Sequence, residues 1–328
     1  MRPLSRRTFV ALTAALAVPR WVHGQTHGRI YRLGWLSIID SSKEPYGLAL
    51  VRRLHELGFV DGKNLQSTYR HAGGQPERLP SLAAELVKLN PDVLFSTGPE
   101  INLLALKKEG GDIPIVFVAV DFDPVATGHV VNPARPSGRL TGITAVQSVL
   151  PGKRLELVKE LLPETRKVAV LGNEQTGGQL AVVEEAAKRL ALELHLIRFK
   201  RPPFDYEGAV NEAVRTKSEV LFVLGSGLFA PARQLITELA LKAALPSVFH
   251  HAQWAEAGGL MSYGFSFPQM WRSGAEMVAK IMRGTKAGDI PMEQPTTYEL
   301  AINARTAKAL GIRIPESIRI RVDRVIDH

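Results

Sequence analysis

Between residues 30 and 250, short apolar runs alternate with longer stretches whose apolar residues recur at helical spacing. The apolar runs occupy residues 31–36, 65–70, 92–96, 113–118, 167–171, 192–197, 219–224 and 246–250. Runs of this length, bounded by turn residues, are typical of strands that are buried on both faces of a parallel sheet. Their alternation with amphipathic helices predicts an α/β fold in which helices flank parallel sheets.

Three stretches break this alternation and divide the chain. Residues 123–142, 258–268 and 284–295 contain several prolines and glycines and show no clean apolar period, and a strand-like run follows at 297–303. We interpret these stretches as crossings between two lobes. The predicted lobe one comprises residues 28–142 and 264–294, and the predicted lobe two comprises residues 143–263 and 295–328. Three crossings between two α/β lobes would leave a cleft between them.

The first 24 residues have the anatomy of an export signal. Arg6 and Arg7 precede an apolar run at residues 9–18, and a Val-x-Gly motif follows at 22–24. The run is far shorter than the roughly 20 residues that a spanning helix needs. The sequence Ser-Arg-Arg-Thr-Phe resembles a twin-arginine signal, and a general secretory signal that contains two arginines is the alternative. We expect export to the periplasm and a soluble mature chain that begins near Gln25.

Charge and cysteine content exclude several kinds of partner. The formal net charge is +9, but Arg2, Arg6, Arg7 and Arg20 of the expected signal carry four of these charges, so the remainder is only mildly basic. We therefore expect no nucleic-acid partner. The absence of cysteine excludes disulfides, thiolate metal sites and a lipid-bearing N-terminal cysteine, so no membrane anchor is expected.

Five segments carry a resemblance that covers essentially the whole mature chain. They are RLHELGFVDGKNL (53–65), ERLPSLAAELVKLNPDVLFSTG (77–98), GKRLELVKELLP (152–163), EAGGLMSYG (256–264) and EQPTTYELAINARTAKALGIRIPESI (293–318). In order and spacing they resemble the family of ABC-transporter substrate-binding proteins that includes the tryptophan-binding type. The resemblance implies a two-lobed periplasmic binding protein with three crossovers, which closes around a small ligand by hinge motion. It also implies that an amino acid or similar small carboxylate is captured and delivered to a membrane permease, and we expect a monomer.

In open α/β sheets, ligands bind beyond the carboxyl ends of the strands, where helix N-termini present free N–H groups. This rule selects residues in the loops that follow the predicted strands. In lobe one the candidates are Ser37, Tyr46, Ser96, Thr97, Gly98, Asp121 and Asp123. In lobe two they are Asn173, Glu174, Ser226, Phe229, His250, Trp254 and Tyr263. We expect the ligand to lie between the loop 96–98 on one side and Asn173, Glu174 and Ser226 on the other.

Several of these candidates have a second interpretation. The hydroxyls of Ser96 and Thr97 and the Gly98 amide could cradle a carboxylate, or the hydroxyls could simply cap the following helix. Asp121 and Asp123 could bind a ligand ammonium or cap a turn. The aromatic candidates Tyr46, Phe229, Trp254 and Tyr263 could sandwich an apolar part of the ligand, or they could pack in the core or at the rim.

Two motifs suggest cofactors that we do not expect. Residues 225–230 match Gly-x-Gly-x-x-Ala, but they lie in the middle of lobe two and no acidic residue follows about 20 residues later to bind a ribose. His250 and His251 are neighbours, so on a strand they would point to opposite faces and could not share one metal. The sequence therefore predicts no cofactor, no metal and no catalytic residues.

Two functions of other classes remain open alongside solute binding. An exported α/β enzyme, such as a hydrolase, is disfavoured because the chain lacks a Gly-x-Ser-x-Gly nucleophile elbow. Two carboxylates such as Asp121 and Asp123 would need separated pKa values and a reactive partner to act in catalysis. A ligand sensor of the same fold, which docks on a receptor instead of a permease, cannot be separated from a transport protein by sequence.

Overall fold

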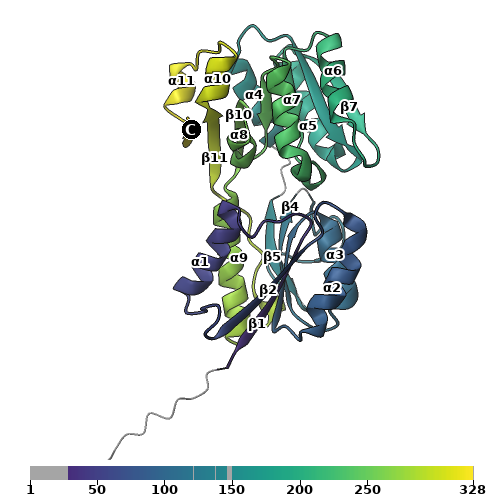
Figure 1. Cartoon of the computed structure of the whole chain (residues 1–328), viewed down its shortest axis with the longest axis vertical. Coiled ribbons are helices and arrows are strands. Elements are labelled where there is room, and N and C mark those ends of the chain that lie inside the picture. Colours follow the sequence, from purple (N-terminus) through teal and green to yellow (C-terminus); the bar gives the residue numbers. More distant parts are fainter. Residues whose placement is uncertain (1–28, 121, 137, 146–149, 328) are drawn as a thin grey trace, which may run out of the picture.

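A computed structural model describes residues 29–327, except 121, 137 and 146–149, and shows two α/β lobes stacked along the long axis (Figure 1). The expected export signal lies outside the described residues. No helix in the described part of the chain is long and apolar enough to cross a membrane.

Lobe one contains a five-stranded parallel sheet in the order β2-β1-β3-β4-β5. Its strands are β1 (Tyr31–Ser37), β2 (Leu65–His71), β3 (Val93–Gly98), β4 (Ile115–Val120) and β5 (Leu140–Ala145). The short helix η1 (Pro76–Arg78) with α2 (Leu79–Lys88) and α3 (Glu100–Glu109) covers one face, and α1 (Pro45–Glu56) with α9 (Phe267–Met282) covers the other (Figure 1). Helix α9 thus packs in lobe one although it follows most of lobe two in the chain.

Lobe two contains a seven-stranded sheet in the order β12-β11-β10-β9-β8-β6-β7. Its strands are β6 (Lys167–Asn173), β7 (Glu193–Phe199), β8 (Val220–Val223), β9 (Ser247–Phe249), β10 (Met261–Phe265), β11 (Tyr298–Asn303) and β12 (Arg324–Ile326). Its helices are α4 (Leu150–Leu161), η2 (Glu174–Thr176), α5 (Gly177–Arg189), α6 (Tyr206–Arg215), η3 (Gly227–Ala232), α7 (Arg233–Lys242), α8 (Ala252–Glu256), α10 (Ala304–Ala309) and α11 (Glu316–Arg319). Helices α4 and α5 pack on one face, and α6, α7 and α8 pack on the other.

The chain passes between the lobes after β5, after β10, and again between η4 (Ala287–Asp289) and β11. Each sheet is covered on both faces by buried apolar side chains, so each lobe has its own core. Two separately packed bodies joined by a few connecting segments are the architecture that permits hinge motion.

Two strands lie in stretches that the sequence indicates as irregular. Strand β5 overlaps the end of the stretch 123–142, and β10 lies within 258–268. Both strands contain a glycine, which in a sequence usually indicates a break in a strand. Here each glycine is needed because the backbone of a neighbouring segment lies too close for a side chain. A side chain at Gly142 would overlap the carbonyl of Phe117, and one at Gly264 would overlap the carbonyl of His250. Glycine inside a strand here marks close backbone approach.

The alternation of strands and helices predicts parallel sheets, but the sheet of lobe two also contains an antiparallel pair. Strands β10 and β11 pair antiparallel, with Tyr263 opposite Leu300. Antiparallel pairing follows because the chain returns from α9 in lobe one and enters the sheet from the cleft side. A direct βαβ crossover would have made the pair parallel.

Candidate ligand-binding pocket between the two lobes

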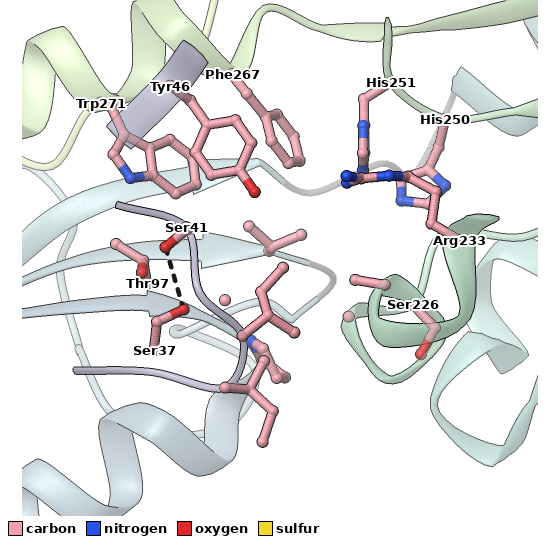
Figure 2. A pocket seen from close by; sticks show the side chains of 17 residues that line it. Ser37, Ser41, Tyr46, Thr97, Ser226, Arg233, His250, His251, Phe267 and Trp271 are labelled. Carbon is pink, nitrogen blue, oxygen red and sulfur yellow. Dashed lines mark hydrogen bonds between the residues drawn. The ribbon is translucent and has the colours of Figure 1, made fainter. Parts of the chain in front are cut away.

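A pocket lies between the lobes, beyond the carboxyl ends of β1 and β3 in lobe one and of β8 and β9 in lobe two (Figure 2). Lobe one contributes the loop after β1, the start of α1, the turn after β3 and the first turns of α9. Lobe two contributes η3, the start of α7 and residues 250–251. This is the position at which open α/β sheets bind ligands.

An aromatic wall, formed by Tyr46, Phe267 and Trp271, lines the lobe-one side of the pocket. The rings of Tyr46 and Trp271 lie 4.8 Å apart between centroids, and those of Phe267 and Trp271 lie 5.4 Å apart in a stacked arrangement. All three side chains are almost completely buried. The indole N–H of Trp271 is buried and has no hydrogen-bond partner among the described residues. The wall therefore offers flat apolar surface together with one unused donor.

Hydroxyl groups face this wall across the pocket, as Figure 2 shows for Ser37, Ser41 and Thr97. Ser37 and Thr97 are neighbours in the sheet, at the ends of β1 and β3. The Ser41 hydroxyl lies 3.4 Å from that of Ser37, and the Thr97 hydroxyl accepts a hydrogen bond of 3.0 Å from the indole N–H of Trp35. Because a hydroxyl has one donor and two acceptor sites, Thr97 retains a proton to donate to a ligand.

The lobe-two side carries a cation, a serine and two histidines. The Arg233 guanidinium forms an ion pair of 2.9 Å with Glu44 of lobe one. Burial lowers the pKa of His250 well below its usual value, and it lowers that of His251 to about 3, with the Arg233 charge adding to the effect on His251. Both imidazoles are therefore neutral at physiological pH. The indole N–H of Trp254 donates to Nε2 of His251 at 3.1 Å, a bond that only an unprotonated Nε2 can accept.

Six of the sequence candidates line this pocket. They are Ser37, Tyr46, Thr97, Gly98, Ser226 and His250. Gly98 has φ of +110°, which only glycine adopts without strain, so the turn after β3 depends on it.

Ser96 and Thr97 are not the capping residues of the helix that follows them, because the N-cap residue of α3 is Pro99, whose side chain makes no capping hydrogen bond. Ser96 is instead buried inside β3, with its backbone opposite Leu36 and Phe117 in the neighbouring strands.

The polar candidates that the structure places elsewhere make local contacts. Asp123 caps a turn, and its carboxylate accepts from the amide of Val125 at 2.9 Å. Asn173 is buried and donates to the Ser226 hydroxyl at 2.8 Å, which fixes the loop after β8. Glu174 is exposed at the start of η2. Asp121 lies outside the described residues.

The remaining aromatic candidates pack away from the pocket. Phe229 is fully buried in an aromatic cluster with Phe204, at a centroid distance of 5.6 Å. Trp254 is also fully buried and stacks on Phe249 at 4.6 Å. Tyr263 stacks on Tyr298 at 6.1 Å near the crossings between the lobes. These three side chains therefore pack in the core or at the rim, which is the second interpretation of the aromatic candidates.

Sequence reasoning missed Arg233, Phe267, Trp271, His251 and Ser41 as lining residues. Arg233 lies just beyond the loop 225–229 that the strand rule selects. Phe267 and Trp271 follow a strand that reads as irregular, so the rule is not applied to them. A search that extended the loop after β8 through η3 to the start of α7, and the loop after β10 through the first two turns of α9, would have included all three.

Among the described residues, no group of three or more histidine, cysteine, aspartate or glutamate side chains is arranged to hold a metal ion. The pocket instead combines rings, hydroxyls and one guanidinium. These groups suit an organic molecule that has an apolar part and a polar, charged part.

The chain is similar to known proteins over most of its length. A family model described as ABC transporter substrate binding protein matches residues 47–326. A tyrosine-binding protein of Clostridioides difficile is 25% identical over 281 residues, which cover 84% of this chain and 78% of that protein. The crystal structure of a conserved domain protein from Vibrio cholerae has a TM-score of 0.81 at 26% identity and covers 90% of this chain and 100% of that chain.

An ABC domain from Streptococcus pneumoniae in complex with L-Trp shares the fold, with a TM-score of 0.80 at 19% identity over 90% of this chain and 100% of that chain. The family model covers most of both lobes and the pocket-lining residues from Thr97 onwards. The chain therefore belongs to the family of ABC transporter substrate-binding proteins.

Proposed function

We propose that the protein binds an amino acid with an aromatic or other large apolar side chain in the interlobe pocket and delivers it to an ABC permease. The observation that carries this proposal is the aromatic wall of Tyr46, Phe267 and Trp271 opposite the guanidinium of Arg233. Rings and a cation match the two ends of such a ligand. The relatives named for tyrosine binding and crystallised with L-Trp support the same class.

Binding of this kind would also drive closure. The rings belong to lobe one, whereas Arg233 and the histidines belong to lobe two. A ligand that touches both sides gains contacts only when the lobes approach, so it has higher affinity for the closed state and shifts the hinge equilibrium towards it.

Calorimetric titration of the purified mature protein with tyrosine, tryptophan, phenylalanine, leucine and glucose tests the proposal. We expect binding of at least one aromatic amino acid and no binding of glucose. Trp271→Ala should weaken binding at least tenfold, about 1.4 kcal/mol, because a stacking surface is lost. Tyr31→Ala removes a ring at the far end of β1 and serves as the control. If no amino acid binds to the wild type, the proposal fails.

We further propose that the ligand is released unchanged, so that the protein is not an enzyme. Membership of a family of substrate-binding proteins supports this. Incubation with amino acids, their esters and their amides, followed by product analysis, should show no turnover. Reproducible product would favour the exported enzyme instead.

We also propose export to the periplasm by the twin-arginine route, as a monomer without a membrane anchor. The support is the sequence of residues 1–24 together with the family, whose members work in transport. Replacement of Arg6 and Arg7 by lysine should block processing to a chain that begins near Gln25, as N-terminal sequencing would show. Unchanged processing would leave the general secretory route.

A further inference from the structure

One ion pair joins the two lobes at the edge of the pocket. Arg233 is the first residue of α7 in lobe two, and its Nη2 lies 2.9 Å from Oε1 of Glu44, the N-cap residue of α1 in lobe one. The two side chains are 20% and 24% exposed, so both are largely withdrawn from bulk water. Charged groups in such surroundings interact more strongly with a ligand than they would at an open surface.

Arg233 is the one charged side chain among the described residues that line the pocket. Its neighbours there are hydroxyls, rings, aliphatic groups and the two neutral histidines. A guanidinium presents five N–H donors in a planar fork. The contact with Glu44 uses Nη2, which leaves other donors of the fork for a second carboxylate.

Glu44 lies close to the same pocket from the lobe-one side. It precedes Tyr46 by two residues, and the Tyr46 ring is part of the aromatic wall. Burial raises the pKa of the Tyr46 hydroxyl, and the Glu44 charge raises it further, as expected for a carboxylate near that hydroxyl. A carboxylate has about four lone-pair positions, so a single bond to Arg233 leaves Glu44 able to accept from an ammonium group.

We propose that this interlobe ion pair is the recognition site for a zwitterion, with Arg233 binding the ligand's carboxylate and Glu44 binding its ammonium group. The inference rests on the proposed function and adds the orientation of the ligand. The side chain of the amino acid lies against Tyr46, Phe267 and Trp271, and its charged end lies at the pair. The carboxylate is then held by lobe two, and not by the loop 96–98 that the sequence favours.

The arrangement also couples recognition to closure. A zwitterion between the two side chains completes a cluster of alternating charges whose members come from both lobes. Either charge of the ligand alone would meet one attractive and one repulsive partner. The pair should therefore discriminate against amines and against carboxylic acids that lack the second charge.

The test pairs two variants with three probes, and calorimetry measures each affinity. The probes are an aromatic amino acid that the wild type binds, the amine that lacks its carboxylate, and the acid that lacks its ammonium group. Arg233→Gln should weaken binding of the amino acid by about tenfold to a hundredfold and should not weaken binding of the amine, because the guanidinium that is removed repels the ammonium group of the amine. Glu44→Gln should weaken binding of the amino acid similarly and should not weaken binding of the acid, because the carboxylate that is removed repels that of the acid. Arg70→Gln, which breaks an exposed ion pair with Glu85, is the control.

Thermal unfolding of each variant first establishes that it folds, and because the two variants lie on different lobes either one alone can decide the outcome. If both variants weaken all three probes equally, the pair is only a latch between the lobes and the proposal is overturned. It is equally overturned if neither variant changes the affinity for the amino acid. If the wild type binds no amino acid at all, the proposed function fails with it, and this outcome is distinguishable from the other two.

Discussion

Thr97 serves the core of lobe one and the pocket with a single hydroxyl. Its Oγ1 accepts from the indole N–H of Trp35, and both side chains are buried. The same hydroxyl lines the pocket. A substitution at this position therefore affects folding and binding together.

Thr97→Val should lower the free energy of unfolding by about 1–3 kcal/mol, because the Trp35 N–H would lose its partner inside the core. Thr97→Ser keeps the hydroxyl and should retain most of that stability. Urea denaturation of both variants measures the difference. Equal stability of Thr97→Val and the wild type would mean that the hydrogen bond contributes nothing.

The buried histidines predict a dependence of stability on pH. Their folded pKa values lie below the ordinary value of 6.5, so the unfolded chain binds protons that the folded chain does not. Stability should therefore fall as pH drops below about 6.5, by roughly 1 kcal/mol for each histidine between pH 7.5 and 5.5.

Urea denaturation at pH 7.5 and 5.5 checks this against His251→Gln, whose carboxamide oxygen can still accept from Trp254. The variant should lose less stability than the wild type over that interval, by roughly 1 kcal/mol. If both proteins lose the same amount, His251 titrates normally in the folded state.

Among the helices, α9 is the element on which both the fold and the pocket depend. It follows most of lobe two in the chain but packs against α1 and the sheet of lobe one, and its first turns provide Phe267 and Trp271 to the pocket. Gly274 allows this close packing. A Cβ atom there would lie 2.9 Å from Cε2 of Phe95, a ring that is fully buried.

Gly274→Ala should therefore destabilise lobe one by about 1–3 kcal/mol, despite the better helix propensity of alanine, because the Phe95 ring has no space to move. Gly178→Ala on α5, where a Cβ would meet nothing within 4 Å, is the matched control and should not lower stability. The midpoint of urea unfolding compares the two. A Gly274→Ala protein as stable as the control would contradict the close packing.

At the scale of the whole molecule, contacts across the cleft hold the two lobes close together. Besides the pair of Arg233 and Glu44, Gly227 of η3 approaches Pro99 at the start of α3. A Cβ at Gly227 would lie 2.9 Å from Cδ of Pro99. The lobes thus approach closely where glycine faces proline.

Gly227→Ala should hold the lobes apart and weaken ligand binding, by about tenfold or more, while each lobe keeps its stability. Calorimetry gives the affinity, and small-angle X-ray scattering of the protein with saturating ligand should report a larger radius of gyration than for the wild type. Gly178→Ala again provides the control. A variant that binds and compacts like the wild type would show that this approach does not limit closure.

The sequence by itself determined the alternation of strands and helices, because apolar spacing along a segment depends only on which faces that segment buries. It placed β1, β2, β6 and β11 within a residue or two of their bounds. Four of the residues that the strand-end rule selects as ligand-binding lie in the lining of the pocket: Ser37, Thr97, Gly98 and Ser226.

Only the tertiary structure decided where glycine belongs inside a strand, as in β5 and β10, because the cause is a neighbouring backbone that is distant in sequence. It also decided which aromatic side chains face the cleft. Phe229 and Trp254 are buried in the core of lobe two, whereas Trp271, on a helix of lobe one, lines the pocket. The partner of Arg233 is Glu44, 189 residues away. A site between two lobes depends on which distant segments come into contact, and the spacing of residues within one segment does not specify those contacts.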